Sequence, residues 1–296
     1  MRGLFSLLTM CTDPSALEGL TWLACYLTTG KHLLFYQSFG TVLLLLSLAA
    51  PLALGLGFLG AMAKRSSVIG VRQLGQVYVA MVRGIPDIVF FLFVPLMIDQ
   101  GLEILRHYTL CPDVTAPIFQ GNDFVVCEAA KLPLSSAEPW VHSLYGFSLA
   151  LAAFAIVFGA FAANTLDGAL GAVPAAQLET ARAYGLRPGQ VFWRIHVPQM
   201  WGYALPGLAN LWQILIKATP LLFLLGIEDI VYWARELGGM KGNRFDYPHP
   251  DWRIWYFSAL LIFYLSMTWG SEKLFARLQG RLAKGQATLA GKGAGV

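Results

Sequence analysis

The sequence predicts an all-α integral membrane protein with about five transmembrane helices. Of its 296 residues, 56% are hydrophobic and only 13% are charged, and the mean hydropathy is +0.58. Soluble domains carry roughly 25% charged residues. Several apolar runs approach the roughly 20 residues that cross a bilayer as a helix. These observations exclude a soluble enzyme, and a net charge of +4 is too small to indicate nucleic-acid binding.

Five apolar runs are predicted spans, at residues 39–62, 77–98, 144–163, 203–227 and 254–272. The second run is interrupted by charged residues. Residues 15–37 combine aromatic side chains with Lys31 and His32, so they predict an interfacial helix lying on the membrane. A sixth span there is the alternative.

Basic residues predict the orientation of these spans. They concentrate after the first and third spans and in the tail after the fifth, whereas the alternate loops hold most of the acids. The positive-inside rule therefore places the N-terminus outside and the C-terminus in the cytoplasm.

The four cysteines fall on the predicted outer side, Cys11 and Cys25 near the N-terminus and Cys111 and Cys127 in the long loop after the second span. Thiols on an oxidising face indicate disulfides. A Cys111–Cys127 bond is favoured because it would close a long loop. Free cysteines are the alternative. No Cys/His spacing indicates a metal site, and no set of residues indicates a catalytic site.

A polar segment with a regular spacing separates two apolar runs on the predicted cytoplasmic side. Residues 179–198 read ETARAYGLRPGQVFWRIHVP. The spacing resembles the EAA motif of ABC-importer permeases, in which EAA, three residues, glycine and nine residues precede I-x-L-P. Thr180 replaces the first alanine and Val197 the leucine. In that family the motif forms a coupling helix that docks into the ATPase subunit.

Other segments resemble permeases of the polar amino-acid type, which import histidine, arginine, glutamine and opines. Tyr78 with RGIP at 83–86 is similar to the family's YVxxxRGTP, and LPGLANLWQILIKATPLLFLLGIEDI is similar to its LPALGNxxxxLLKDTSLLSVIGVPEL. The resemblance covers about residues 38–100 and 144–275. It implies the type I ABC importer permease fold in a bacterial inner membrane, with a periplasmic N-terminus.

On this resemblance the chain has three parts. Residues 1–37 form an N-terminal periplasmic or interfacial segment, 38–275 the transmembrane permease domain and 276–296 a cytoplasmic tail. The domain contains a periplasmic insertion at about 99–143, the coupling helix at about 175–198 and a periplasmic loop at about 228–253. Glu228 and Asp229 begin that loop, where they could meet a binding protein or be solvated.

The resemblance implies a set of ATPase-coupling residues. An acid near a helix start suits the dipole, alanines permit close approach, and glycine permits a turn that other residues resist. The set is Glu179, Ala181, Ala183, Gly185, Leu186, Arg187, Pro188, Gly189 and Pro198.

A second set is predicted to line the substrate pathway: Arg83, Pro86, Asp87, Asn164, Lys217 and Thr219. Pro86 would kink its span, and Arg83 could instead snorkel to the interface. Lys217 is predicted near mid-span, where a charge needs a partner, either an acid such as Asp87 or a substrate carboxylate. Ala218 stands where the family has Asp. In the stretch AANTLDGAL, Asn164 and Asp167 stand where the family often has the Glu and Arg of an AExxRG-like pattern, and Asp167 is expected at a solvated helix end.

The implied function is that of a non-catalytic permease subunit of a binding-protein-dependent ABC importer for a polar amino acid or related solute. Its expected partners are a cytoplasmic ATPase dimer that binds ATP and Mg, a second permease, a periplasmic solute-binding protein and membrane lipid. No G-x-x-x-x-G-K-[ST] run appears, so the ATPase is expected in another chain. The alternatives are an ATP-independent secondary transporter or channel, which would show inverted repeats or intramembrane acids, and a membrane-embedded enzyme.

Overall fold

The computed structural model describes residues 11, 17–114 and 116–283, and nearly all of its regular structure is helical. The first helices are α2 (Gly19–Leu27), α3 (Gly30–Lys64), α4 (Ile69–Gly84), α5 (Asp87–Leu110) and α6 (Pro139–Ala172). The later ones are α7 (Ala175–Ala183), α8 (Pro188–Val191), α9 (Val197–Ala218), α10 (Ile230–Gly238) and α11 (Arg253–Ala283). In the part described, the named β-strands are the two of a short hairpin, β1 (Phe119–Gln120) and β2 (Asp123–Phe124).

Four helices of the described chain are long and apolar enough to cross a membrane: Gly30–Lys64, Ile88–Leu110, Pro139–Ala172 and Arg253–Leu282. They agree with the predicted all-α membrane class. The remaining predicted span, 203–227, divides between α9 and the 3-10 helix η4 (Thr219–Leu225). Pro220 lacks the N–H that would continue α9, so the regular helix ends at Ala218.

The chain divides into two compact units. The first joins residues 1–46 to 219–266, and the second joins 47–218 to 267–296, so α3 and α11 each contribute to both.

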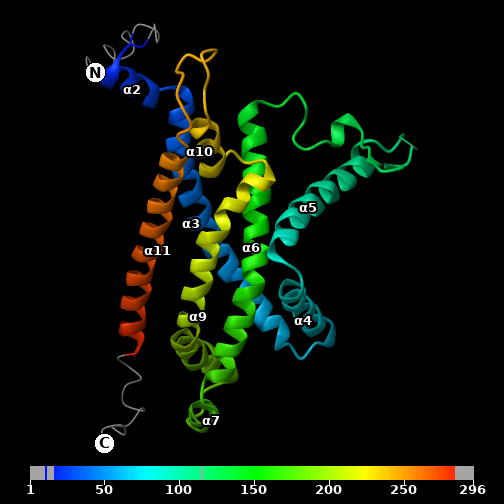
Figure 1. The fold of residues 1–296 in the computed structure, drawn as a ribbon. Helices are drawn as coiled ribbons and strands as arrows, with labels where there is room; N and C mark the ends of the chain where they lie inside the picture. The colour runs from blue at the N-terminus through cyan, green and yellow to red at the C-terminus, as the bar shows by residue number, and fades with distance from the viewer. Residues whose placement is uncertain (1–10, 12–16, 115, 284–296) are drawn as a thin grey trace, which may run out of the picture. The chain divides into compact units, whose positions relative to one another are not determined.

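In the second unit, α6 packs against α9, α5 and α4, and α6 and α9 run side by side (Figure 1). Small residues bring α3 and α6 together. A Cβ built on Gly57 would lie 2.6 Å from the Ala162 Cβ, and one on Gly60 would lie 2.9 Å from the Ala163 Cβ. Only glycine therefore fits these two positions without a shift. Near the ends of α6 and α9 the core is apolar, with buried residues Ala61, Leu166, Ala169, Leu170, Val173, Met200 and Ala204.

The predicted interfacial helix at 15–37 is wrong for its second half. Residues 30–37 are the first turns of α3, which runs unbroken for 35 residues. Only Gly19–Leu27 forms a separate helix, and its nine residues are too short to be a sixth span. Thr28 and Thr29 separate the two helices. The Thr28 hydroxyl donates to the Ala24 carbonyl and the Thr29 hydroxyl pairs with His32 Nδ1, and such local side-chain hydrogen bonds compete with continuation of the helix.

The second predicted span, 77–98, is interrupted rather than kinked. Ile85 is extended at φ −121° and ψ 139°, and Pro86 at φ −57° and ψ 137° caps the start of α5. Proline disfavours the helical conformation of the residue before it and has no N–H to donate. The chain therefore changes direction between α4 and α5, and α5 leads away from α6 toward the 111–138 loop (Figure 1).

Candidate functional site

The turn after α7 explains why the sequence has glycine at 185. Gly185 adopts φ +82°, the left-handed region. Its N–H donates to the Arg182 carbonyl at 2.9 Å, and the Leu186 N–H donates to the Ala181 carbonyl at 3.2 Å. This pair of bonds is the Schellman motif, which satisfies carbonyls at the end of a helix. A Cβ on Gly185 would meet nothing within 4 Å, so the requirement for glycine lies in the backbone alone.

The chain then starts a new helix at once. Arg187 is extended, Pro188 is the first residue of α8, and the Arg187 N–H donates to Gln190 Oε1 at 2.9 Å. Proline suits this first position, where its missing N–H has no helical partner. The π-helix η3 (Phe192–His196) connects α8 to α9, and His196 Nε2 donates to the Leu170 carbonyl at 2.8 Å. The turn is thereby attached to the end of α6.

Most of the predicted coupling residues are exposed on this turn. They are Glu179, Ala183, Gly185, Arg187, Pro188, Gly189 and Pro198, with Leu186 half-buried. Ala181 is buried and packs inside the protein, so its small size serves the protein's own fold. Glu179 is the fifth residue of α7, so the expectation that it lies near the helix start is wrong. We call residues 175–198 the coupling turn.

Two aromatic side chains extend the exposed surface of the coupling turn. Tyr184 is 83% exposed and Trp193 is 61% exposed. Tyr184 lines a cavity of about 510 Å³, which is also bordered by Thr180, Leu186 and Arg194 among others. Sequence reasoning missed both aromatics, although their place in a polar segment was a usable signal. A surface with exposed aromatic and arginine side chains is typical of protein interfaces.

The predicted pathway residues are dispersed. Arg83, Pro86 and Asp87 flank the break between α4 and α5, where the side chains of Arg83 and Asp87 lie outside the described part. Asn164 is exposed on α6. Thr219 is buried at the start of η4, within 2.9 Å of the Tyr264 hydroxyl.

Lys217 is exposed in the last turn of α9, directly before η4 continues the predicted span 203–227, and its place near mid-span stays a prediction. A cation at a helix C-terminus is favoured by the dipole. Among the described side chains no acid pairs with it.

Asp167 is not the solvated helix end that the sequence predicts. Its carboxylate accepts from Lys64 Nζ at 2.6 Å and from Arg65 Nε at 2.7 Å, and Arg65 Nη2 also donates to the Asp167 carbonyl at 2.7 Å. This half-buried ion triad joins the end of α3 to α6. Sequence reasoning missed it because the partners are about 100 residues apart.

Asp229 is also not solvated. It is fully buried and caps α10, where its Oδ1 accepts the N–H groups of Val231 and Tyr232 at 3.0 and 2.9 Å. Its Oδ2 has no hydrogen-bond partner. Burial raises the pKa of Asp229 to about 6, against the lowering effect of the backbone hydrogen bonds.

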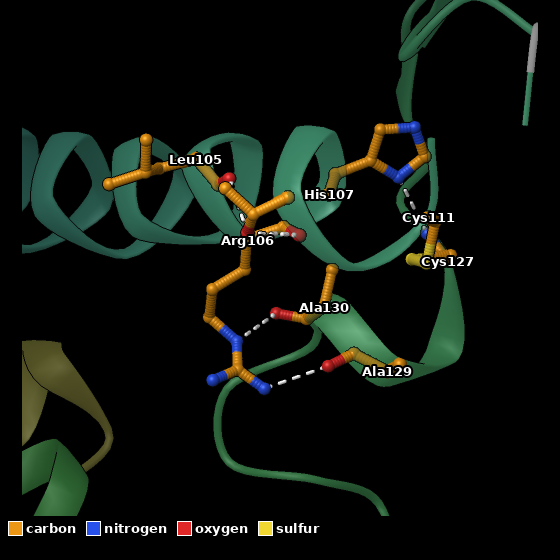
Figure 2. Close-up of a disulfide and its surroundings, with 8 residues drawn as sticks. Leu105, Arg106, His107, Cys111, Cys127, Ala129 and Ala130 are labelled. Atoms are coloured by element: carbon orange, nitrogen blue, oxygen red, sulfur yellow. Dashed lines mark hydrogen bonds between the residues drawn. A yellow bond between two sulfur atoms is a disulfide. The ribbon is translucent and has the colours of Figure 1, made fainter. Parts of the chain in front are cut away.

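A disulfide joins Cys111 to Cys127, and a second joins Cys11 to Cys25, so all four cysteines are paired. Figure 2 shows how the end of α5 holds the loop around the Cys111–Cys127 disulfide. Arg106 donates to the carbonyls of Ala129 and Ala130 at 2.7 and 3.2 Å. His107 Nδ1 accepts the Cys127 N–H at 3.1 Å. The ligand atoms of His107 and these two cysteines lie within 4.8 Å of one another. They are unsuited to a metal because both sulfurs and Nδ1 are already engaged.

Comparison with known proteins identifies the family. Residues 35–284 match the model of the binding-protein-dependent transport system inner membrane component. The chain belongs to this family. The histidine/lysine/arginine/ornithine transport system permease protein HisQ of Salmonella typhimurium strain LT2 is 31% identical over 235 residues, which are 79% of this chain and 86% of HisQ.

Two other relatives and one solved structure are similar. The arginine ABC transporter permease protein ArtQ of Escherichia coli strain K12 is 29% identical over 71% of this chain and 78% of its own. The nopaline transport system permease protein NocQ of Agrobacterium fabrum strain C58 is 29% identical over 71% and 74%. A crystal structure of an amino acid ABC transporter with histidines has a TM-score of 0.58 and 20% identity, and covers 84% of this chain and 94% of its own. At that identity it shows the fold alone.

The predicted resemblance to ABC-importer permeases is therefore confirmed, as is the helical permease fold. The protein is an inner-membrane permease subunit of a binding-protein-dependent transport system. As a permease component it is not an enzyme, and family membership argues against both the ATP-independent transporter and the membrane-embedded enzyme.

Proposed function

We propose that this permease imports a polar amino acid or a related small solute such as an opine, together with a second permease, a periplasmic solute-binding protein and a cytoplasmic ATPase dimer that binds ATP and Mg. The names of the relatives support the solute class, since they refer to histidine, lysine, arginine, ornithine and nopaline. These solutes share an α-carboxylate and a nitrogen-rich side chain.

The observation that carries the coupling role is the form of the coupling turn. Gly185 and Pro188 separate two short helices, so the backbone projects from the body of the protein with Tyr184, Arg187 and Trp193 exposed. The bond from His196 to Leu170 and the burial of Ala181 attach the same turn to α6. A displacement of the turn by the ATPase would thus pass to the helix that packs against α4, α5 and α9.

The pathway residues belong to the same proposal. Lys217 is exposed, cationic and without a described acid partner, so it suits a solute carboxylate. Asn164 and Thr219 supply uncharged polar groups, and Arg83, Pro86 and Asp87 lie at the break where helical backbone is interrupted. Interrupted helices line many transport sites in membranes.

Site-specific cross-linking tests docking and orientation together. Because all four native cysteines are paired, an introduced cysteine is the one free thiol. Gly189 and Ser136 are both exposed, and Ser136 lies in the loop before α6, outside the candidate spans. A photoreactive maleimide on Gly189→Cys should cross-link to the co-expressed ATPase, whereas the same reagent on Ser136→Cys, in the proposed periplasmic insertion, should not. Equal cross-linking from both positions, or none from Gly189→Cys in an intact complex, would contradict the proposal.

Uptake by the reconstituted importer tests the solute class. Competition of labelled L-arginine uptake by L-histidine, L-glutamine and nopaline should rank these solutes. An importer that takes up none of them, yet hydrolyses ATP in response to its binding protein, would overturn the amino-acid proposal and leave the coupling role intact.

A further inference from the structure

An apolar cavity lies in the first unit, and none of its lining residues belongs to the coupling turn or the proposed pathway. It measures about 550 Å³ and is formed by α2, the first turns of α3, and the start of α11 with the residue before it. Ligand pockets for small molecules commonly have 300–1,000 Å³. Its walls are mostly aromatic, from Tyr26, Phe35, Tyr36, Trp252, Trp255 and Tyr256.

The imidazole and hydroxyl groups in these walls are already hydrogen-bonded, and the Tyr36 hydroxyl donates to the Leu27 carbonyl at 3.1 Å. His32 Nδ1 pairs with the Thr29 hydroxyl at 2.8 Å, and His32 Nε2 pairs with the Tyr256 hydroxyl at 2.6 Å. The Tyr256 hydroxyl donates to the Tyr26 hydroxyl at 3.3 Å, which pairs with His249 Nε2 at 2.9 Å. Buried polar groups that are mutually satisfied have little to offer a polar ligand. The cavity therefore favours hydrocarbon over an amino acid or a sugar.

The place of the cavity indicates which kind of hydrocarbon would fit it. α3 and α11 are both helices able to span the membrane, and the cavity uses His32 and Trp255, the third residue of each. The first turns of a span lie where headgroups meet acyl chains, and Trp and Tyr are enriched at that level. Trp255 is 72% exposed and Tyr36 is 46% exposed, so the cavity opens at the surface between aromatic side chains.

Basic groups lie at the same level as the cavity opening. Lys31, one residue before His32, is exposed and shares Glu236 with Lys241, so two ammonium groups face one carboxylate. A surplus of positive charge beside an apolar groove matches a phospholipid, whose phosphate is anionic and whose chains are apolar.

We propose that this cavity binds one acyl chain of a membrane phospholipid, with the headgroup beside Lys31. On the proposed orientation the lipid belongs to the outer leaflet. The site does not depend on the identity of the transported solute. Its role is to fix the first turns of α3 and α11 to α2 and to the loop that carries His249.

Photo-cross-linking of the assembled transporter in lipid nanodiscs tests the site directly. The probe is phosphatidylethanolamine with a diazirine near the glycerol end of one acyl chain. Ala259 lines the cavity and is exposed, and Ala276 is exposed on the same helix but does not line it. We expect adducts on the peptides of Tyr36 and Trp255, reduced at least fivefold by Ala259→Trp and unchanged by Ala276→Trp.

Fluorescence supplies a second measurement that needs no cavity-filling variant. Phospholipid brominated near the glycerol end should quench Trp255, so Trp255→Phe should remove more of the quenched signal than Trp269→Phe. Trp269 is a fair control, since it is 61% exposed on the same helix and does not line the cavity. Three results would each overturn the proposal. They are adducts spread evenly over α11, an equal loss of quenching in Trp255→Phe and Trp269→Phe, and cross-links from the cavity to a second permease chain.

Discussion

Replacement of Gly185 by valine tests whether the shape of the coupling turn determines ATPase docking. At φ +82° a residue with a Cβ is strained by about 1–2 kcal/mol, and a β-branched residue by up to about 3 kcal/mol. Because nothing lies within 4 Å of the new Cβ, no steric term is added. Each 1.4 kcal/mol is a factor of about ten. A strain of about 2 kcal/mol thus lowers the ratio of native to rearranged turn by roughly 30-fold.

The assay compares Gly185→Val with Gly70→Val in binding to the ATPase and in uptake. Gly70, the second residue of α4, lies outside the coupling turn, is also exposed, has equally open space around its Cβ and has an ordinary φ. We expect Gly185→Val to insert in the membrane but to weaken ATPase binding about 10- to 30-fold, because only the native turn is competent. Gly185→Asn should recover most of the loss, since asparagine tolerates this conformation. Equal behaviour of the two valine variants would refute the reasoning.

Three further predictions concern single features. Burial raises the pKa of Asp229 from 3.8 to about 6, so the folded state holds the proton more tightly than the unfolded state. The free energy of unfolding should therefore fall by about 3 kcal/mol as the pH rises from 3.8 to about 6. Asp229→Asn should lose that pH dependence, and an unchanged slope in the melting temperature would argue against it. Lys217→Met should keep ATPase binding and lose uptake; wild-type uptake would remove Lys217 from the pathway. Serine at both Cys111 and Cys127 should destabilise the loop by about 3 kcal/mol, given a separation of 16 residues, and an unaltered rate of proteolysis there would contradict this.

Patterns in the sequence predict the membrane class, because a run of apolar residues needs no partner to be recognised. They do not predict where helices end inside such a run. Hydropathy continues across Ile85-Pro86 and across Pro220, but a missing N–H and a restricted preceding residue stop the helix at both places. Lys31 and His32 lower the hydropathy of residues 30–37, so the sequence predicts this segment to be separate from the first span. In the structure it belongs to α3, because Lys31 pairs with Glu236 and His32 with Tyr256.

In the candidate site, too, local features could be predicted from the sequence and long-range contacts could not. The need for a positive φ at Gly185 could be predicted from spacing, because the Schellman motif is made by neighbours in the chain. The partners of Asp167 and the burial of Asp229 could not, since both depend on elements brought together only by folding. The place of Lys217 in the apolar run also does not show that α9 ends one residue later.

The close crossing of α3 and α6 at Gly57 and Gly60 has a consequence for motion. Helices whose backbones touch through glycine and alanine have no side-chain layer to slide on, so a shift along the crossing would force atoms together. We therefore expect the crossing segments of α3 and α6 to move together as a rigid unit during transport. A change of angle between helices is absorbed most easily where the backbone is already interrupted, and in the second unit Ile85-Pro86 is such an interruption.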